Sequence, residues 1–191
     1  MARRLLLAAG VGGGLLLVGG WALAARRRRL GLEALADQLA DELGVDRAIV
    51  KATVVAESSW NPRAKNCTGG DAAAGCAWGL LQLTPATARG AGFTGPLESL
   101  FDPETNLRIG VGLMAQYQRR WGDRDAMRYR IAWRFGPGRA DQWPPQGEAA
   151  VVAAGSSNYR AALRRYGWTG SVWSGEGVFS GAVAAMLRHA A

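Results

Sequence analysis

The sequence predicts a mainly helical protein, with one folded domain behind an apolar amino-terminal segment. Apolar residues recur at helical spacing over most of the chain, and Ser, Thr or Asp stands before several of these stretches, as expected of helix N-caps. No convincing alternation of apolar and polar residues predicts strands, and no internal repeat is visible. The 191 residues suffice for one ordinary domain with its own core and an appendage.

The amino-terminal segment predicts a membrane anchor. Residues 5–25 carry no charge and have Arg on both sides. As a helix they would extend about 31 Å, which matches the hydrocarbon core of a bilayer. We therefore predict a single transmembrane helix within residues 1–30. The alternative is a cleaved signal peptide, although the apolar run is longer than the usual signal core. The larger number of Arg after the span favours a body facing the cytoplasm.

The charge is concentrated in that segment. Six of the 23 Lys and Arg residues lie among the first 30 residues, so residues 31–191 carry 17 basic and 15 acidic side chains. A nearly neutral body argues against nucleic-acid binding, which needs a basic face on the folded domain. The Arg run at 26–29 adjoins the apolar segment and therefore predicts contact with lipid head groups.

Helix start and stop signals divide the body into elements. The predicted helices span residues 32–43, 47–61, 85–90, 103–121, 123–135 and 157–166. The expected N-caps are Asp46, Thr84, Asp102 and Asp123. We expect a folded body over residues 31–167. Residues 168–191 would form a carboxy-terminal tail, either a surface helix or a docking segment.

Two cysteines lie in one Gly- and Ala-rich loop. Cys67 and Cys76 are nine positions apart. A disulfide between them would fit an oxidising compartment, and two free thiols are the alternative. With the distant His189 they cannot form a four-ligand zinc site, so we expect no metal centre.

Glu57 is the most informative residue. Ile49, Val50, Thr53 and Val54 predict one face of a helix, and Glu57 falls on the same stripe. A carboxylate on the packed side of a helix is rare without a partner. Burial favours the protonated form of a carboxyl group, and such a group can act as a general acid. From this stretch alone, an ion-paired or helix-end glutamate is the alternative.

Three sequence blocks, in order, resemble the goose-type-lysozyme-like lytic transglycosylases, the soluble-transglycosylase (SLT) family. The blocks are residues 57–62, residues 79–88, and residues 100–103 followed by Asn106, Leu107 and Gly110. The resemblance covers about residues 32–166. It implies that the body has the lysozyme-like helical fold of that family.

The resemblance implies that Glu57 is the catalytic acid of a peptidoglycan lytic transglycosylase. Such enzymes cleave the β-1,4 bond between N-acetylmuramic acid and N-acetylglucosamine and close a 1,6-anhydro ring on the muramyl product, without a cofactor. The internal nucleophile removes the need for a second carboxylate. A hydrolytic muramidase is the alternative, and Asp71 in the cysteine loop is the carboxylate that would support it.

The resemblance also implies a substrate-binding role for Gln82, whose amide can both donate to and accept from an N-acetyl group. Gly79 would let the backbone approach a sugar, Ser58 would hold the neighbouring carboxyl group, and Trp78 would stack on a sugar face. Each also has a structural alternative: a tight turn, a local hydrogen bond and a core position, respectively. Trp60 has the same two alternatives as Trp78.

One family block is altered. Family members carry Ala-Tyr-Asn-Ala-Gly where residues 132–136 of this chain read Ala-Trp-Arg-Phe-Gly. Trp133 would offer an indole N–H in place of the tyrosine hydroxyl. Arg134 would weaken Glu57 as an acid if it lay close by, unless it points to solvent or to a peptide-stem carboxylate. This change motivates a third hypothesis, a catalytically weak wall-binding or structural component.

The expected partners are peptidoglycan strands and a lipid membrane. Secretion-machine or virion proteins are further candidates, and nucleic acid is not expected. We expect a single-pass membrane protein, either in a bacterial inner membrane facing the periplasm or in the internal membrane of a bacteriophage virion. The charge bias around the predicted span favours the viral setting.

Overall fold

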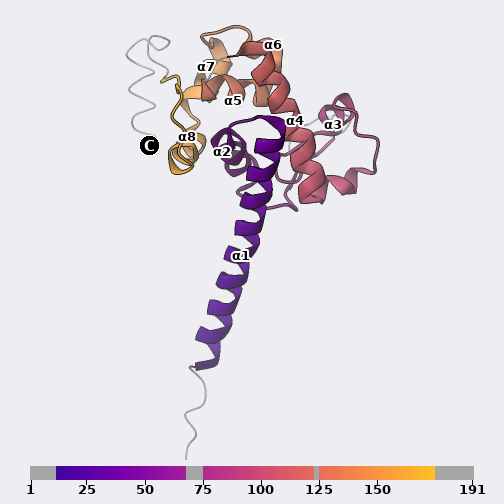
Figure 1. Ribbon diagram of the computed structural model, residues 1–191, viewed down its shortest axis with the longest axis vertical. Helices are drawn as coiled ribbons and strands as arrows, with labels where there is room; N and C mark the ends of the chain where they lie inside the picture. Colours follow the sequence, from indigo (N-terminus) through magenta and orange to yellow (C-terminus); the bar gives the residue numbers. More distant parts are fainter. Residues whose placement is uncertain (1–11, 68–74, 123–124, 175–191) are drawn as a thin grey trace, which may run out of the picture.

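The structure, a computed structural model, describes residues 12–67, 75–122 and 125–174 of the 191-residue chain. A long helix, α1, enters a body of shorter helices and packs there beside α2 (Figure 1). The elements, in chain order, are α1 (Gly12–Leu43), α2 (Arg47–Ser58), β1 (Lys65–Asn66), β2 (Ala77–Trp78), α3 (Pro85–Gly90), η1 (Leu97–Phe101), α4 (Pro103–Trp121), α5 (Ala126–Phe135), α6 (Pro137–Ala140), α7 (Gly147–Ala154) and α8 (Ser157–Arg165). The predicted helical class is confirmed.

The membrane-anchor prediction is not supported. Among the described residues, no helix combines the length and the apolarity that crossing a bilayer requires. Residues 5–11 of the predicted span lie outside the described residues. The expected boundary between residues 30 and 31 falls inside α1.

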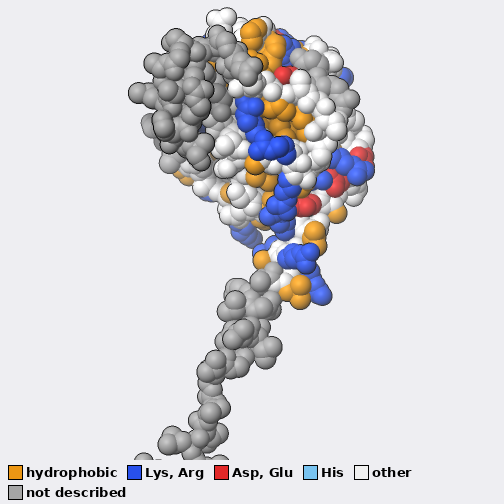
Figure 2. Space-filling model, turned by 90° about the vertical axis from the view of Figure 1, so that its left-hand side faces the viewer, with side chains coloured by type: hydrophobic (Ala, Val, Ile, Leu, Met, Phe, Trp, Pro, Cys, Tyr) orange, Lys and Arg blue, Asp and Glu red, His pale blue; other side chains and the backbone are white. Residues whose placement is uncertain are grey.

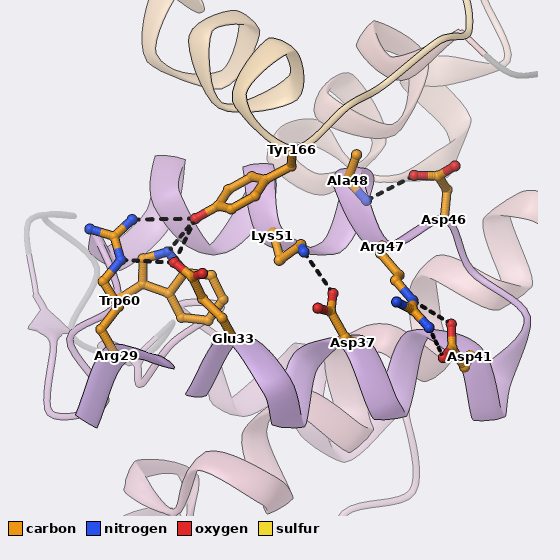
Figure 3. Close-up of polar contacts among 10 residues, drawn as sticks. All are labelled: Arg29, Glu33, Asp37, Asp41, Asp46, Arg47, Ala48, Lys51, Trp60 and Tyr166. Atoms are coloured by element: carbon orange, nitrogen blue, oxygen red, sulfur yellow. Dashed lines mark hydrogen bonds and ion pairs between the residues drawn. The ribbon is translucent and has the colours of Figure 1, made fainter. Parts of the chain in front are cut away.

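Acidic side chains at four-residue spacing line the edge of α1 that faces the body (Figure 3). This spacing places them on one helical face. Their partners come from α2 and from the segment after α8. The pairs are Glu33 with Tyr166, Asp37 with Lys51 and Asp41 with Arg47. The docking of α1 thereby sets the position of α2.

The helix that carries Glu57 forms as the sequence predicts. The Asp46 side chain accepts a hydrogen bond of 2.8 Å from the backbone N–H of Ala48 and caps α2. The predicted apolar stripe of α2 is buried. The helix ends at Ser58, and Ser59 adopts a left-handed conformation with φ 51°.

Two helix starts illustrate what N-cap signals predict. Asp102 caps α4 as expected, accepting from Thr105 N–H at 2.9 Å. The predicted start of α5 at Asp123 is wrong, because the helix begins at Ala126 and Asp125 is its N-cap. Asp125 accepts from Met127 N–H at 2.9 Å, whereas Asp123 lies outside the described residues.

A small hairpin, not predicted, follows α2. Lys65 lies opposite Trp78 and Asn66 opposite Ala77 in antiparallel register. Strands of two residues are too short to show alternation in the sequence. Cys67 and Cys76 form a disulfide just beyond the paired residues.

The core lies where α1, α2, α4, α5 and α8 meet the loop after β2. Its large, fully buried side chains include Leu39, Ile49, Leu81, Leu107, Ile131 and Leu163. Because each of these helices and the loop contributes to one core, the last turn of α2 is held against α5 and α8.

Candidate active site

Glu57 lies in the last turn of α2 and forms an ion pair with Arg130 of α5. Both side chains are mostly buried, with 16% of Glu57 and 13% of Arg130 exposed. The predicted placement of Glu57 on the packed side of its helix agrees with this burial. Its closest charged partner comes from a helix 73 residues later in the chain.

Arg130 has further contacts that hold its guanidinium in place. It lies over the ring of Tyr159, 5.9 Å from the ring centre. Tyr159 is fully buried and donates a hydrogen bond of 3.1 Å to the Ala126 carbonyl, and burial raises the pKa of its hydroxyl. The Nε atom of Arg130 is buried without a hydrogen-bond partner in the described structure. The guanidinium is therefore tied to Glu57 at one nitrogen and unsatisfied at another.

The altered family block places no cation on Glu57. Arg134 is exposed, as one of its two alternatives expected, and Arg130 supplies the cation that pairs with Glu57 among the described residues. Trp133 is half-buried and packs near Gly110 of α4, with no hydrogen bond from its indole among the described residues.

Gln82 sits in a strained loop after β2. Its backbone has φ 48°, a left-handed conformation that side-chain-bearing residues rarely adopt. Its side-chain nitrogen donates to the carbonyls of Ala64 at 3.2 Å and Gly79 at 3.0 Å. Both amide hydrogens are thus used within the protein, and the amide oxygen remains to accept a hydrogen bond from a ligand.

Gly79 fills a position that no other residue could occupy. Its φ is +74°, and an added Cβ would lie 2.3 Å from the Leu100 carbonyl oxygen and 2.4 Å from the Asn106 amide nitrogen. The residue is buried, which gives it a packing role. Its contact with a sugar stays a prediction.

Three other predicted residues have mainly internal contacts. Trp78 is 7% exposed, with Lys65 3.9 Å above its ring centre and the Phe101 ring 5.0 Å away. Trp60 is 5% exposed and donates to the Tyr166 hydroxyl at 3.2 Å. Ser58 donates to the Val54 carbonyl at 3.3 Å, the local alternative. These contacts favour the structural roles without testing substrate binding.

Two pockets of similar size flank α8. One, about 370 Å³, is lined by Arg130 and Arg134 of α5, by Ala56 of α2 and by the start of α8. The other, about 380 Å³, lies between the end of α2, Arg29 of α1 and Arg165 of α8. Asn158 lines both. The first is lined by Arg130, the partner of Glu57, and by Ala56, the residue before Glu57.

Sequence reasoning missed Arg130 and the structural role of Asn106. Position 130 lies between Met127 and Ile131, which are both buried in α5. A cation among such residues indicates a side chain that faces the core and needs a charged partner. Asn106 belonged to a quoted family block but had no assigned role. In the structure it is buried and bonds to Leu81, Trp78 and Leu100. Asp71 and His189 lie outside the described residues.

The arrangement suits proton transfer by one carboxyl group. A mostly buried carboxyl group is paired with one guanidinium, and the arginine that carries this guanidinium lines a pocket. Among the described residues, no group of three or more His, Cys, Asp or Glu side chains could hold a metal ion.

Comparisons with known proteins point to one family. The chain is 33% identical over 94 residues to the soluble lytic murein transglycosylase of Escherichia coli, covering 46% of this chain and 13% of that protein. It is 31% identical over 102 residues to membrane-bound lytic murein transglycosylase E of Buchnera aphidicola, covering 48% and 43%. It is 35% identical over 82 residues to the transglycosylase of Enterobacteria phage PRD1, covering 43% and 27%.

Among solved structures, the X-ray structure of an inactive mutant of lytic transglycosylase Slt from Pseudomonas aeruginosa matches 70% of this chain and 21% of its own, with 24% identity and a TM-score of 0.48. The chain thus spans less than half the length of these curated relatives. The model of the transglycosylase SLT domain matches residues 34–150, more than half of the chain, and this confirms the resemblance carried by the three sequence blocks. The chain therefore belongs to the transglycosylase SLT domain family.

Proposed function

We propose that the protein is a peptidoglycan lytic transglycosylase in which Glu57 acts first as acid and then as base. The observation that carries the proposal is the place of Glu57, mostly buried at the end of α2 and beside a pocket, in a chain of the SLT family. The substrate bond is the β-1,4 link between N-acetylmuramic acid and N-acetylglucosamine.

In the proposed reaction, protonated Glu57 gives its proton to the glycosidic oxygen as the bond to the muramyl C1 breaks. The resulting carboxylate takes the proton of the muramyl 6-hydroxyl, and that oxygen bonds to C1 and closes the 1,6-anhydro ring. One carboxyl group suffices because the nucleophile is already part of the substrate.

Gln82 is proposed to orient the substrate through its amide oxygen. Its two amide hydrogens are held by the carbonyls of Ala64 and Gly79, so the oxygen would accept from the N–H of an N-acetyl group. The strained backbone of Gln82 fits a residue fixed for binding.

The first test is a Glu57→Gln variant, which keeps the shape of the side chain but cannot carry the proton. We expect its turnover of purified peptidoglycan to fall by at least about 100-fold, the usual loss when a general acid is removed. Glu98→Gln, at an exposed position in η1, is the matched control and should keep full turnover. Full activity in Glu57→Gln would reject the proposal.

A second candidate function is wall binding with little turnover, and the Glu57–Arg130 pair favours it. The guanidinium of Arg130 occupies one oxygen of the carboxyl group that would have to act on the substrate. The two candidates separate in a sedimentation assay with purified wall. Retention on the wall with no soluble product across a pH series would support the second candidate.

We further propose that the activity opens the wall locally. The relatives include bacterial transglycosylases and one from a phage, which fits an envelope or a virion setting. Detection of the protein by mass spectrometry in purified phage particles would support the virion setting. Detection of the protein in cell envelopes but not in particles would exclude that setting.

A further inference from the structure

The pocket beside Glu57 has the composition of an anion site. Two arginines line it, the mostly buried Arg130 and the exposed Arg134, together with Ser156, Ser157 and Asn158, and no Asp or Glu is among the described residues of its lining. The three polar residues belong to the N-cap and first turn of α8, where the helix dipole also favours negative charge, although the backbone N–H groups of Ser156 and Ser157 already donate to Ala153 and Gly155.

The surroundings of the pocket are basic as well. Figure 2 shows the side of the molecule on which α8 lies in Figure 1, and Lys and Arg side chains form a band that runs down this side to α1. The neighbouring pocket, which shares Asn158, is lined by Arg29 and Arg165 and also lacks a carboxylate. An anionic polymer strand would be attracted to this face.

Arg130 connects the pocket to Glu57. Its guanidinium carries five N–H donors, one of which goes to Glu57 while the buried Nε donor has no partner in the described structure. A buried unsatisfied donor calls for an explanation, and a ligand in the adjoining pocket would satisfy it. An anion there would then compete with Glu57 for the same guanidinium.

We propose that the pocket binds a carboxylate of the peptide stems on the peptidoglycan strand, and that Arg130 turns from Glu57 toward this carboxylate. Freed from Arg130, the Glu57 carboxyl group becomes available to the glycosidic oxygen. Arg130 is thus a positioning residue that holds the enzyme inactive until a carboxylate-bearing strand arrives. This inference rests on the proposed transglycosylase function.

The experiment compares two matched substrates. One is a preparation of soluble peptidoglycan strands, freed of phosphate-bearing polymers, with free stem carboxylates. The other is the same preparation after carbodiimide and ammonia have converted those carboxylates to amides. We expect amidation to lower the kcat/KM of the wild type about tenfold, the factor that about 1.4 kcal/mol represents.

Two arginine variants assign the effect to the pocket. In Arg130→Gln the amidation effect should shrink to less than about twofold, and turnover of amidated strands should exceed that of the wild type because Glu57 has lost its partner. In Arg134→Gln the preference for strands with free stem carboxylates over amidated strands should fall. The KM for the carboxylate-bearing strands should rise, with little change in kcat. Arg139→Gln removes an exposed arginine of α6 outside the pocket and should keep the tenfold preference.

A binding measurement covers the case in which Arg130→Gln does not fold. In Glu57→Gln the competitor for Arg130 is gone, so carboxylate-bearing strands should bind about tenfold more tightly than they bind the wild type, while amidated strands bind both proteins equally. Calorimetry on the two proteins measures this without turnover. If Arg130 had only a structural role, Glu57→Gln would not bind carboxylate-bearing strands more tightly while binding amidated strands as the wild type does.

The inference is overturned if wild-type enzyme cleaves both substrates equally, or if Glu57→Gln gains no affinity for the carboxylate-bearing strands. Neither outcome touches the proposed function, which is tested separately by the turnover of Glu57→Gln and by the chemistry of the product ends. The two failures are therefore distinguishable.

Discussion

Asn106 is the residue that fixes the loop carrying Gln82. Its side-chain oxygen accepts from Leu81 N–H at 2.8 Å, and its nitrogen donates to the carbonyls of Trp78 and Leu100, each at 2.9 Å. The side chain is fully buried, and the Leu81 N–H and the Leu100 carbonyl depend on it for a hydrogen bond, whereas the Trp78 carbonyl also accepts from Leu83 N–H at 3.0 Å. Gly79 allows this close packing because it has no Cβ.

We predict that Asn106→Leu lowers the free energy of unfolding by about 3 kcal/mol, because it leaves several backbone groups buried and unpaired. Urea denaturation followed by circular dichroism measures the change. Gln116→Ala, at an exposed position of the same helix, should change stability by less than about 0.5 kcal/mol. An equal loss in both variants would contradict the role of Asn106.

At this scale the sequence locates Glu57 but not its partner. The apolar stripe of α2 and the family block both single out position 57. Arg130 lies 73 residues away on another helix, and no local pattern indicates which cation packs against a carboxylate. Arg134 is the plausible alternative from the motif, yet it is exposed, four residues after Arg130 on the same helix.

Among the elements, the β1–β2 hairpin connects α2 to the Gln82 loop. The Ala64 carbonyl, just before β1, accepts from Gly79 N–H at 2.8 Å as well as from the Gln82 side chain. The disulfide between Cys67 and Cys76 closes the hairpin. The covalent link therefore restrains the two ends of the segment that positions Gln82.

We predict that the double change Cys67→Ser and Cys76→Ser lowers the free energy of unfolding by about 2–3 kcal/mol, the loop-closure entropy of a crosslink of this length. Thermal unfolding measures it. A reducing agent should lower the Tm of the wild type to that of the variant and leave the variant unchanged. A Tm of the wild type that does not respond to the reductant would contradict this prediction.

Helices with strong caps could be predicted, whereas weakly marked elements could not. Thr84 and Asp102 accept hydrogen bonds from their helices as the sequence indicates. The helix α7 begins after Gln146 without a side-chain cap, in a run of Ala and Val that has no clear period. Its place in the fold comes from packing against α5.

For the whole molecule, α1 is attached to the body through buried apolar residues and polar contacts. The Tyr166 hydroxyl donates to Glu33 at 2.9 Å and accepts from Trp60 and Arg29 (Figure 3). Burial raises the pKa of the Glu33 carboxyl group, but the hydrogen bonds from Arg29 and Tyr166 lower it by more. The pKa of Glu33 therefore lies below its ordinary value of 4.5.

A lowered pKa in the folded state means that ionised Glu33 stabilises the fold above pH 4.5 and that this contribution is lost as the pH falls through the folded-state pKa. We therefore predict an acid-induced loss of stability below about pH 4.5 that is shallower in Glu33→Gln. Denaturant titrations at a series of pH values measure it. The exposed Glu98→Gln should keep the wild-type slope, and identical slopes in all three proteins would contradict the prediction.

At the scale of the whole molecule, the boundary that the sequence predicts between residues 30 and 31 lies inside one continuous helix, and the division into anchor and body stays a prediction. Residues 26–29 and 32–43 belong to a single helix, so the basic run leads directly to the acidic edge that meets the body. The spacing of apolar residues identified the amphipathic part of α1, residues 32–43. Between Gly12 and that part, the sequence carries no local stop signal, and α1 runs through it as one helix.

The most direct test of the central claim is cleavage of peptidoglycan in water enriched in oxygen-18, with the products analysed by mass spectrometry. If Glu57 directs ring closure, muramyl product ends will be one water lighter than reducing ends and will carry no label, and Glu57→Gln will release almost none. Labelled reducing ends from the wild type would show hydrolysis instead and would contradict the account.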